Sequence, residues 1–266
     1  MINAVTFNLG CGGPHSQART AAAFEWAVQA RSQYDLVFAQ EIPGDEWLEL
    51  WRDTHIVHAF NTPKYRVRSA ILANKVLASC DASFPTSDYH DSYVAACNLQ
   101  LDSIGTVVCM SVHASPSIVA KSWLEPWRAA RLPLPQERAS VGLWDADMLL
   151  STVLDVATRI PVLIAGDWNE ARAWDANHPH NSGEAFFQRV EVGGLIDCTY
   201  SEWQTERATC LPTHGESLQV DHVFATNNVA DLISGFEVGA PPAPEFDHLP
   251  ISFAIDSPIA VQSGAA

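Results

Sequence analysis

Polar side chains that could perform catalysis directly follow an apolar run in the middle of the chain. The run VLIAGD ends in Asp167, and the sequence continues Trp-Asn-Glu, so that Asn169 stands two residues beyond the aspartate. In an extended chain successive side chains point to opposite sides, which places Asp167 and Asn169 together and Trp168 on the other face. A carboxylate and an amide on one side can hold a ligand. Taken alone, Gly-Asp-Trp-Asn is more typical of a turn, because Gly, Asp and Asn are common turn residues.

Other strand-like runs end in polar groups in the same way. The runs AVTFN, LVFAQE and VVCMSVH finish in an amide, a carboxylate and an imidazole. QVDHVFAT holds an aspartate within an apolar strand, where a carboxylate is unfavourable unless it is paired or liganded, and FDHLPISFAI places Asp-His at the start of the last strand. Neighbouring strands lie about 5 Å apart, so such groups can meet at one rim. In chain order the candidate residues are Asn8, Glu41, His113, Asp167, Asn169, Asp221, Asp247 and His248.

The segments that must position these residues show strand and helix patterns. Runs rich in β-branched residues predict strands at 3–9, 35–40, 68–78, 93–101, 105–113, 161–166, 219–226 and 250–256. Helical patterns lie at 16–31, about 45–51, 140–158 and 182–191. YVAACNLQL and GTVVCMSVH, joined by DSIG, predict an antiparallel hairpin. We therefore expect an α/β fold in which two mixed, largely antiparallel β-sheets pack face to face and are flanked by helices.

One domain accounts for the whole pattern. No repeat, low-complexity segment or linker interrupts the chain, which predicts a single domain over 1–258 and a flexible C-terminal tail over 259–266. No run of about 18 apolar residues is present and the start MINAVTFN lacks a basic leader, which predicts a cytoplasmic protein with no membrane span. The six cysteines show no Cys-x-x-Cys spacing, which favours buried free thiols over a zinc site or a disulfide framework.

The charge balance restricts the partners of the chain. Fifteen basic and 31 acidic residues give a formal net charge of −16. A surface of this sign repels polyanions, so strong nonspecific binding to duplex nucleic acid requires local basic residues or a bound metal ion. Any site that handles phosphate therefore needs cations.

The ordered candidate set resembles the endonuclease/exonuclease/phosphatase superfamily. That superfamily includes pancreatic-type deoxyribonucleases, abasic-site endonucleases, sphingomyelinases and inositol-polyphosphate phosphatases. The resemblance extends from residue 5 to about residue 256. It implies a four-layered α/β sandwich and hydrolysis of phosphoester bonds with Mg²⁺ or Mn²⁺. It also implies that Glu41, aided by Asn8 and with Asp247 in the same acidic cluster, binds the metal, which agrees with the preference of a hard cation for oxygen ligands.

The resemblance assigns catalytic roles to the other candidates. It implies that His248 is the catalytic histidine and that Asp221 is its carboxylate partner, which fixes the imidazole tautomer and favours its charged form. Asp167 and Asn169 match the pair that orients the attacking water and holds a phosphate oxygen. His113 matches a second phosphate-contacting position.

Three departures from the family pattern bear on the substrate. Abasic-site endonucleases carry an acid two residues after the first-strand asparagine, where this chain has Gly10. The residue before the final Asp-His is usually small and hydroxylic, and here it is Phe246. The segment YRVRSAILANK supplies Arg66, Arg68 and a serine but no acid, which leaves His113 without an assigned carboxylate partner.

Two interpretations of the segment 114–147 stay open. It interleaves aromatic and basic residues, which could stack bases and hold phosphates, or its tryptophans could simply pack on the body of the protein. The residues concerned are Trp123, Trp127, Trp144, Lys121, Arg128, Arg131 and Arg138. His222 is predicted to turn away from the site, and His178 and His180 are predicted to lie in a solvated loop.

The predicted activity is hydrolysis of phosphodiester bonds by a divalent-metal enzyme, with DNA or RNA as the expected substrate and partner. A phosphatase or phosphodiesterase of a small metabolite or lipid headgroup is the alternative. A third hypothesis is a binding module that has lost turnover. Against it, clustered carboxylates repel one another unless a cation is present, so a scaffold has no electrostatic reason to keep them together.

Overall fold

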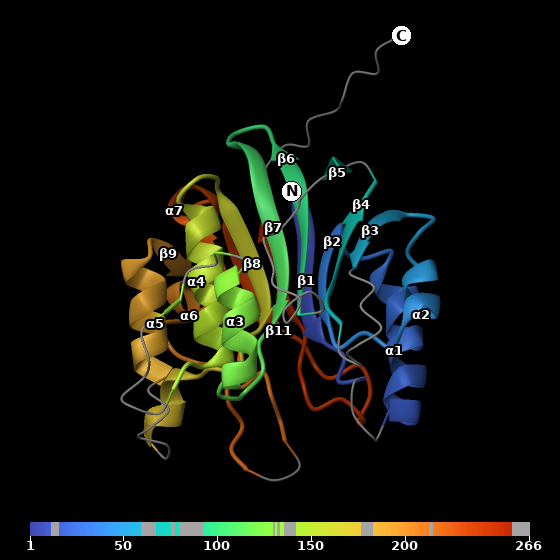
Figure 1. The fold of residues 1–266 in the computed structure, drawn as a ribbon. Coiled ribbons are helices and arrows are strands. Elements are labelled where there is room, and N and C mark those ends of the chain that lie inside the picture. Colours follow the sequence, from blue (N-terminus) through green and yellow to red (C-terminus); the bar gives the residue numbers. More distant parts are fainter. Residues whose placement is uncertain are drawn as a thin grey trace.

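Two six-stranded β-sheets pack face to face, with helices on the outer side of each (Figure 1). The computed structural model describes residues 1–11, 16–59, 68–75, 78–79, 93–129, 131, 134–135, 142–176, 183–212 and 215–256. The two packed sheets and their flanking helices confirm the predicted α/β sandwich. The predicted tail and the loop with His178 and His180 lie outside the described residues.

The first sheet has the strand order β11-β12-β1-β2-β4-β3. Its strands are β11 (Ile233–Val238), β12 (Ile251–Ile255), β1 (Ile2–Asn8), β2 (Leu36–Gln40), β4 (Ala70–Asn74) and β3 (His55–Ala59). β1 and β2 run parallel, and the other pairs are antiparallel. Because β1 and β2 are parallel, their carboxyl ends lie side by side, and Asn8 pairs in register with Gln40.

The second sheet has the order β5-β6-β7-β8-β10-β9. Its strands are β5 (Ala78–Ser79), β6 (Val94–Leu101), β7 (Gly105–His113), β8 (Val162–Asp167), β10 (Asp221–Thr226) and β9 (Leu195–Asp197). β6 and β7 form the predicted hairpin, β7 and β8 are parallel, and β10 runs antiparallel to β8. The carboxyl ends of β7 and β8 therefore meet the amino end of β10.

The helices complete four layers. α1 (Ser16–Ala30) and α2 (Asp45–Glu49) cover the first sheet, while α4 (Asp145–Ala157) and α5 (Gly183–Val192) cover the second (Figure 1). The remaining helices are α3 (Lys121–Ala129), α6 (Cys198–Trp203), α7 (Asn227–Ala230) and the 3-10 helix η1 (Arg172–Ala176). Within the described residues, none of these helices combines the length and apolar character needed to span a bilayer.

Strand alternation builds three apolar layers. Between the sheets, one face of β1 contributes Ile2 and Ala4, while Val5 and Phe7 on its other face pack against α1. The ring of Phe7 makes edge contacts with Trp26 at 5.1 Å and with Phe246 at 5.0 Å. Phe246, one of the departures from the family pattern, is thus a core residue that anchors the chain just before Asp247 and His248.

The described thiols are free, and three of them, Cys97, Cys109 and Cys198, are buried as the sequence predicts. The five described cysteines, Cys11, Cys97, Cys109, Cys198 and Cys210, are all free. Cys97 and Cys109 are register partners in the β6–β7 hairpin. Burial and the neighbouring Cys97 raise the pKa of the Cys109 thiol well above its usual value, so it packs as a small apolar group.

Candidate active site

The predicted site residues lie at one end of the sandwich, on the faces that the two sheets turn toward each other. Asp167 has the same parity along β8 as Leu163 and Ala165, which pack between the sheets. Asn8 follows the buried inter-sheet positions Ile2 and Ala4 in the same way along β1. The alternation that forms the core therefore continues into the site.

A layer of neutral polar groups separates the site from the apolar core. The Gln40 Nε2 donates to Ser111 Oγ at 2.9 Å and to Thr6 Oγ1 at 3.3 Å. The Ser111 hydroxyl in turn donates to the carbonyl of Ala39 at 3.0 Å. These bonds join the two sheets directly beneath the ionisable residues, which fixes the relative position of the strand ends.

Sheet pairing places two ionisable residues beside Asp167. His113 is its register partner on β7, and Asp221 is its partner on β10. The preceding Gly166 has φ +152°, and a Cβ there would lie 1.9 Å from the carbonyl oxygen of Val112. Only glycine permits this close approach of β7 and β8. The Gly-Asp dipeptide is therefore required by the packing as well as by the site.

Asp167 is the centre of the hydrogen-bond network. Its Oδ2 accepts from Asn8 Nδ2 at 2.8 Å, and its Oδ1 accepts from the backbone N–H of Asn169 at 2.9 Å. The same Oδ2 lies 3.7 Å from His113 Nε2 and 3.8 Å from His248 Nε2. Two imidazoles, one from the last residue of β7 and one from the segment before β12, therefore face one carboxylate.

Burial brings the pKa of Asp167 close to neutral pH. Loss of hydration raises its pKa to about 6, and the negative charge of Asp221 contributes to the rise, against the opposing effects of His248 and His113. A carboxyl group with a pKa in this range can exchange a proton near neutral pH, which is the property required of a general acid or base.

His248 and Asp221 form a buried ion pair. The Nδ1 of His248 lies 2.9 Å from Asp221 Oδ2, and both side chains are almost fully buried. Burial alone would lower the pKa of His248, but the Asp221 carboxylate, its hydrogen bond and the Asp167 charge raise it well above the usual value. The Asp221 carboxylate therefore favours the charged form of His248, whose Nε2 points toward Asp167.

Glu41 supplies the partner that sequence reasoning could not find for His113. Glu41 Oε1 lies 3.4 Å from His113 Nε2 and 3.3 Å from Asn8 Nδ2. Glu41 directly follows β2 with φ 48°, and its side chain is 20% exposed, so its carboxylate faces the site while remaining reachable from solvent. The missing signal was spatial, because His113 and Glu41 come from different sheets.

The Gly-Asp-Trp-Asn stretch divides as strand alternation predicts. Trp168 is fully buried, and its ring packs on Phe186 at 5.6 Å and on Phe224 at 5.2 Å. Asn169 lies on the other side with φ 50°, a conformation that asparagine tolerates, and its Nδ2 donates to the carbonyl of Ala114 at 2.8 Å. The stretch is therefore the end of β8 and the start of the loop that follows it, and it contributes Asp167 and Asn169 to the site.

Asp247 differs from the other candidates in its contacts. Its Oδ2 accepts from Arg19 Nη2 at 2.9 Å. Seven candidates are linked by the contacts described above, namely Asn8, Glu41, His113, Asp167, Asn169, Asp221 and His248. Asp247 borders this group as the neighbour of His248. Sequence reasoning missed Arg19, because an isolated arginine in an amphipathic helix carries no distinctive signal.

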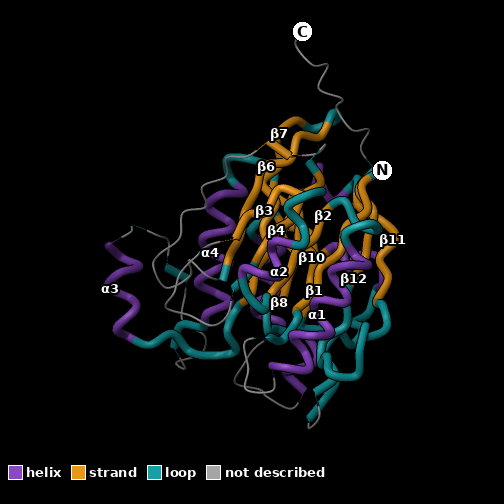
Figure 2. The backbone as a smooth tube through the Cα atoms, turned by 90° about the vertical axis from the view of Figure 1, so that its right-hand side faces the viewer, coloured by secondary structure: helices purple, strands orange, loops and turns teal. Residues whose placement is uncertain are grey.

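The tryptophan-rich segment packs in part on the body. Trp127 is 1% exposed and forms a small cluster with Val119, Leu143 and Met148, so it is not available to stack on bases. α3 itself stands away from the sheets (Figure 2). Its Lys121 is exposed, and its Arg128 is paired with Glu125 at 3.1 Å. The side chain of Trp123 and residue Arg138 lie outside the described residues.

His222 has a structural environment, as predicted. It is fully buried, its Nε2 lies 3.0 Å from the carbonyl oxygen of Glu170, and its Nδ1 lies 3.6 Å from Asp197 Oδ2. Burial opposes protonation, yet the hydrogen bond and charge of Asp197 raise the pKa of His222 above its usual value. β10 therefore carries one buried Asp–His pair on each of its faces.

The donor set of the site fits a hard divalent cation. Asp167, Asp221 and His248 can bring one ligand atom each within 4.8 Å of one another. Asp221 favours the charged form of His248, and an imidazole ligates a metal only when it is neutral. Glu41 is the more accessible carboxylate, and oxygen ligands are those that Mg²⁺ and Mn²⁺ prefer. The Oδ1 of Asp221 has no hydrogen-bond partner among the described residues, so the buried acids are not fully compensated by protein donors.

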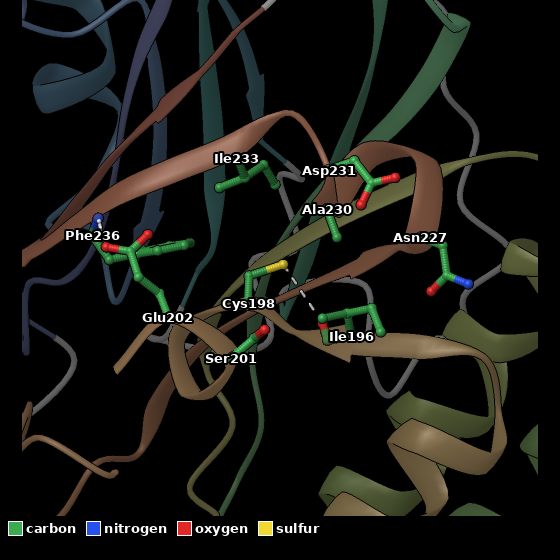
Figure 3. A pocket seen from close by; sticks show the side chains of 9 residues that line it. All are labelled: Ile196, Cys198, Ser201, Glu202, Asn227, Ala230, Asp231, Ile233 and Phe236. Carbon is green, nitrogen blue, oxygen red and sulfur yellow. Dashed lines mark hydrogen bonds between the residues drawn. The ribbon is translucent and has the colours of Figure 1, made fainter. Parts of the chain in front are cut away.

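A cavity of about 260 Å³ is lined by side chains from β9, α6, α7 and β11 (Figure 3). It lies at the opposite end of β10 from the candidate site. Asn227 at its edge follows the last residue of β10, whereas Asp221 is the first residue of that strand. Glu202, which also lines it, is bound through its carboxylate to the N–H groups of Gly235 and Phe236. The cavity is therefore separate from the clustered acids and histidines.

Comparison with known proteins agrees with the geometry. The model of the Endonuclease/Exonuclease/phosphatase family matches residues 5–240. No curated protein matches the chain in sequence.

Solved structures share the fold at low sequence identity. The 3' phosphatase NExo from Neisseria, bound to a product DNA hairpin, is 15% identical with a TM-score of 0.67, over 96% of this chain and 100% of that one. An AP endonuclease from Archaeoglobus fulgidus is 14% identical with a TM-score of 0.65, over 96% and 100% of the two chains. The endonuclease domain of TRAS1, a telomere-specific non-LTR retrotransposon, is 16% identical with a TM-score of 0.61, over 96% and 99%. With the family match over most of its length, the chain belongs to the endonuclease/exonuclease/phosphatase family.

Proposed function

We propose that this protein is a divalent-metal-dependent phosphodiester hydrolase that acts on DNA or RNA. The observation that carries the proposal is the junction of Asp167 with two imidazoles and two amides at the mouth of the sandwich, next to the accessible carboxylate of Glu41. This arrangement combines a proton acceptor, a fixed positive charge and an oxygen ligand for a cation.

Glu41 is the residue that we propose to hold the metal ion, with Asn8 as its companion. In this arrangement the Asn8 amide nitrogen bonds both Glu41 and Asp167, and its Oδ1 accepts from the N–H of Gly10 at 2.9 Å. Asn8 therefore orients the two carboxylates. Bound Mg²⁺ or Mn²⁺ supplies a Lewis acid that polarises the phosphoryl oxygens and offsets the charge of the transition state.

Asp167 is proposed to accept the proton of the attacking water. Its pKa of about 6 leaves it ionised at neutral pH and still basic enough to take up a proton. The N–H of Asn169 holds one carboxylate oxygen in place, so the other faces the site. As the water oxygen attacks phosphorus, its proton passes to Asp167, the P–O bond to the leaving oxygen breaks, and the departing alkoxide takes up a proton from solvent water.

His248 and His113 are proposed to bind the phosphoryl group. The charged Nε2 of His248 faces the same space as Asp167, and Asp221 fixes the ring through its Nδ1. A preorganised cation in a buried site stabilises the charge that develops on the phosphoryl oxygens. His113 approaches from β7, with its Nε2 between Glu41 and Asp167.

Nucleic acid is the proposed substrate class because of what the structural neighbours act on. The NExo structure contains a product DNA hairpin, and the Archaeoglobus protein is an AP endonuclease. The net charge of −16 makes the cations of the site necessary for binding a polyanion.

The test is a substrate panel. We expect the purified protein to cleave single-stranded DNA, plasmid or RNA, and bis-p-nitrophenyl phosphate, with Mg²⁺ or Mn²⁺ and not with chelator. Glu41→Gln should abolish this activity, and Glu49→Gln, an exposed acid paired with Arg52, serves as the matched control. Turnover of p-nitrophenyl phosphate alone would favour a phosphatase of small molecules. No turnover and no metal-dependent rise in Tm would refute the proposal.

A further inference from the structure

Arg19 joins the two loops that border the candidate site. Its Nε donates to the carbonyl of Glu245 at 2.7 Å, its Nη1 to the carbonyl of Gly10 at 3.3 Å, and its Nη2 to Asp247 Oδ2 at 2.9 Å. Gly10 belongs to the loop that follows Asn8, and Asp247 precedes His248. One guanidinium from α1 therefore connects both segments.

Gly10 leaves the space that this guanidinium fills. A Cβ on Gly10 would lie 2.4 Å from Arg19 Nη1 and 3.3 Å from Asp247 Oδ1, and the residue has φ +58°. Any side chain at position 10 would have to displace Arg19. The guanidinium of Arg19 therefore occupies the space that a side chain at position 10, two residues after Asn8, would fill.

This cation changes the charge available to a metal ion. An arginine stays protonated at all relevant pH values, so its charge is permanent. The side chains of Arg19 and Asp247 are 22% and 35% exposed, which leaves the pair only partly screened by water. A divalent ion that used Asp247 would have to displace Arg19 and remain close to its positive charge.

We propose that Arg19 withholds Asp247 from the metal ion, so that the cation site of this chain is built from the Glu41 side alone. This inference rests on the proposed function and departs from the metal-binding role that family resemblance implies for Asp247. Arg19 is then a positioning residue that sets the charge and the ligand number of the site.

The test measures Mn²⁺ binding to the full chain by isothermal titration calorimetry and by electron paramagnetic resonance. Arg19→Gln should release Asp247 and tighten Mn²⁺ binding by about fivefold or more, because it removes one positive charge near a divalent ion. The double variant Arg19→Gln/Asp247→Asn restores the net charge and should bind Mn²⁺ within about twofold of wild type. Arg19→Lys keeps the charge and should not tighten binding.

The outcomes separate this inference from the proposed function. If Glu41→Gln leaves Mn²⁺ binding unchanged, the proposed metal site is wrong. If Glu41→Gln abolishes binding and the double variant also loses about tenfold or more in affinity, Asp247 is a ligand and the inference about Arg19 is wrong. Unchanged or weaker binding by folded Arg19→Gln would also overturn it.

A measurement on the unaltered protein covers the case in which the variants unfold. The Nη2–H signal of Arg19, whose nitrogen donates to Asp247, can be followed by NMR during titration with Mg²⁺. We expect its chemical shift and its protection from solvent exchange to persist at saturation, because the ion pair stays intact. Loss of that protection would show that Asp247 leaves Arg19 for the ion and would refute the inference.

Discussion

The two Asp–His pairs of β10 allow a matched test of catalysis against stability. Asp221 pairs with His248 at 2.9 Å in the candidate site, and Asp197 lies 3.6 Å from His222 on the other face. All four side chains are buried. Asp221→Asn and Asp197→Asn therefore remove the same charge from chemically similar pairs, only one of which faces the proposed substrate.

The size of the catalytic effect follows from the charge that is removed. Two unit charges about 4 Å apart interact by about 4 kcal/mol at an effective dielectric constant near 20. If Asp221 holds His248 as the imidazolium in the transition state, loss of that interaction lowers the rate by up to about a thousandfold, since each 1.4 kcal/mol, roughly, is a factor of ten. We expect a fall in kcat with little change in KM.

The stability effect should run the opposite way. Asp221 repels Asp167 but also pairs with His248, so in Asp221→Asn the relief of the like-charge repulsion offsets part of the cost of breaking the buried pair, and Tm should fall less than in Asp197→Asn. Asp197 accepts hydrogen bonds from Thr199 and from the N–H of Tyr200, and breaking a buried pair destabilises by about 3–5 kcal/mol. Asp197→Asn keeps part of this bonding and should lower Tm with kcat retained.

The assay combines steady-state kinetics on bis-p-nitrophenyl phosphate with thermal unfolding of both variants. Wild-type kcat in Asp221→Asn, together with a Tm below that of Asp197→Asn, would refute the assignment of Asp221 and His248 to the reaction. Loss of kcat in a folded Asp197→Asn would show that the Asp197–His222 pair also affects catalysis, which would contradict its purely structural role.

Three further outcomes are expected. Glu41→Gln should eliminate the rise in Tm caused by Mg²⁺ without lowering the Tm of the metal-free protein, as thermal denaturation with and without chelator would show. Gly166→Ala should destabilise by at least about 1–3 kcal/mol in urea unfolding, because a side chain there meets the Val112 carbonyl in a disfavoured conformation; equal stability would contradict the close approach. Because the pKa of His222 is raised, its contribution to stability is fully present below pH 6.5, the usual pKa of histidine, and is lost as pH rises through the folded-state pKa. Because the pKa of Asp197 is lowered, its contribution is present above pH 3.8, the usual pKa of aspartate, and is lost as pH falls through the folded-state pKa. Asp197→Asn should therefore flatten the dependence of the unfolding free energy on pH at both ends, and an unaltered profile would count against this pair.

The sequence contained most of the framework. Each predicted strand and helix corresponds to an observed element, because the long apolar runs lie in the middle of the sheets or against them. The strands that it missed include β3, β9 and β11, which are short or lie at sheet edges. β11 also carries a register shift between Ser234 and Glu237, which breaks the alternation on which strand prediction depends.

The site was predictable in its members and less so in its contacts. Alternation correctly separated Asp167 from Trp168 and Asp221 from His222. The contact of Glu41 with His113 and the pairing of Arg19 with Asp247 join segments far apart in the chain. No local pattern encodes such pairs, because they depend on how the two sheets and α1 are placed against each other.

The polar layer of Thr6, Gln40 and Ser111 has a consequence for access to the site. The space between the sheets changes from hydrocarbon to hydroxyl and amide groups and then to ionisable groups within a few residues of each strand. The buried apolar residues beneath this layer offer ions and water no polar path to the site from that side. New substrates could therefore be accommodated by altering the loops around that opening while the strands beneath stay as they are.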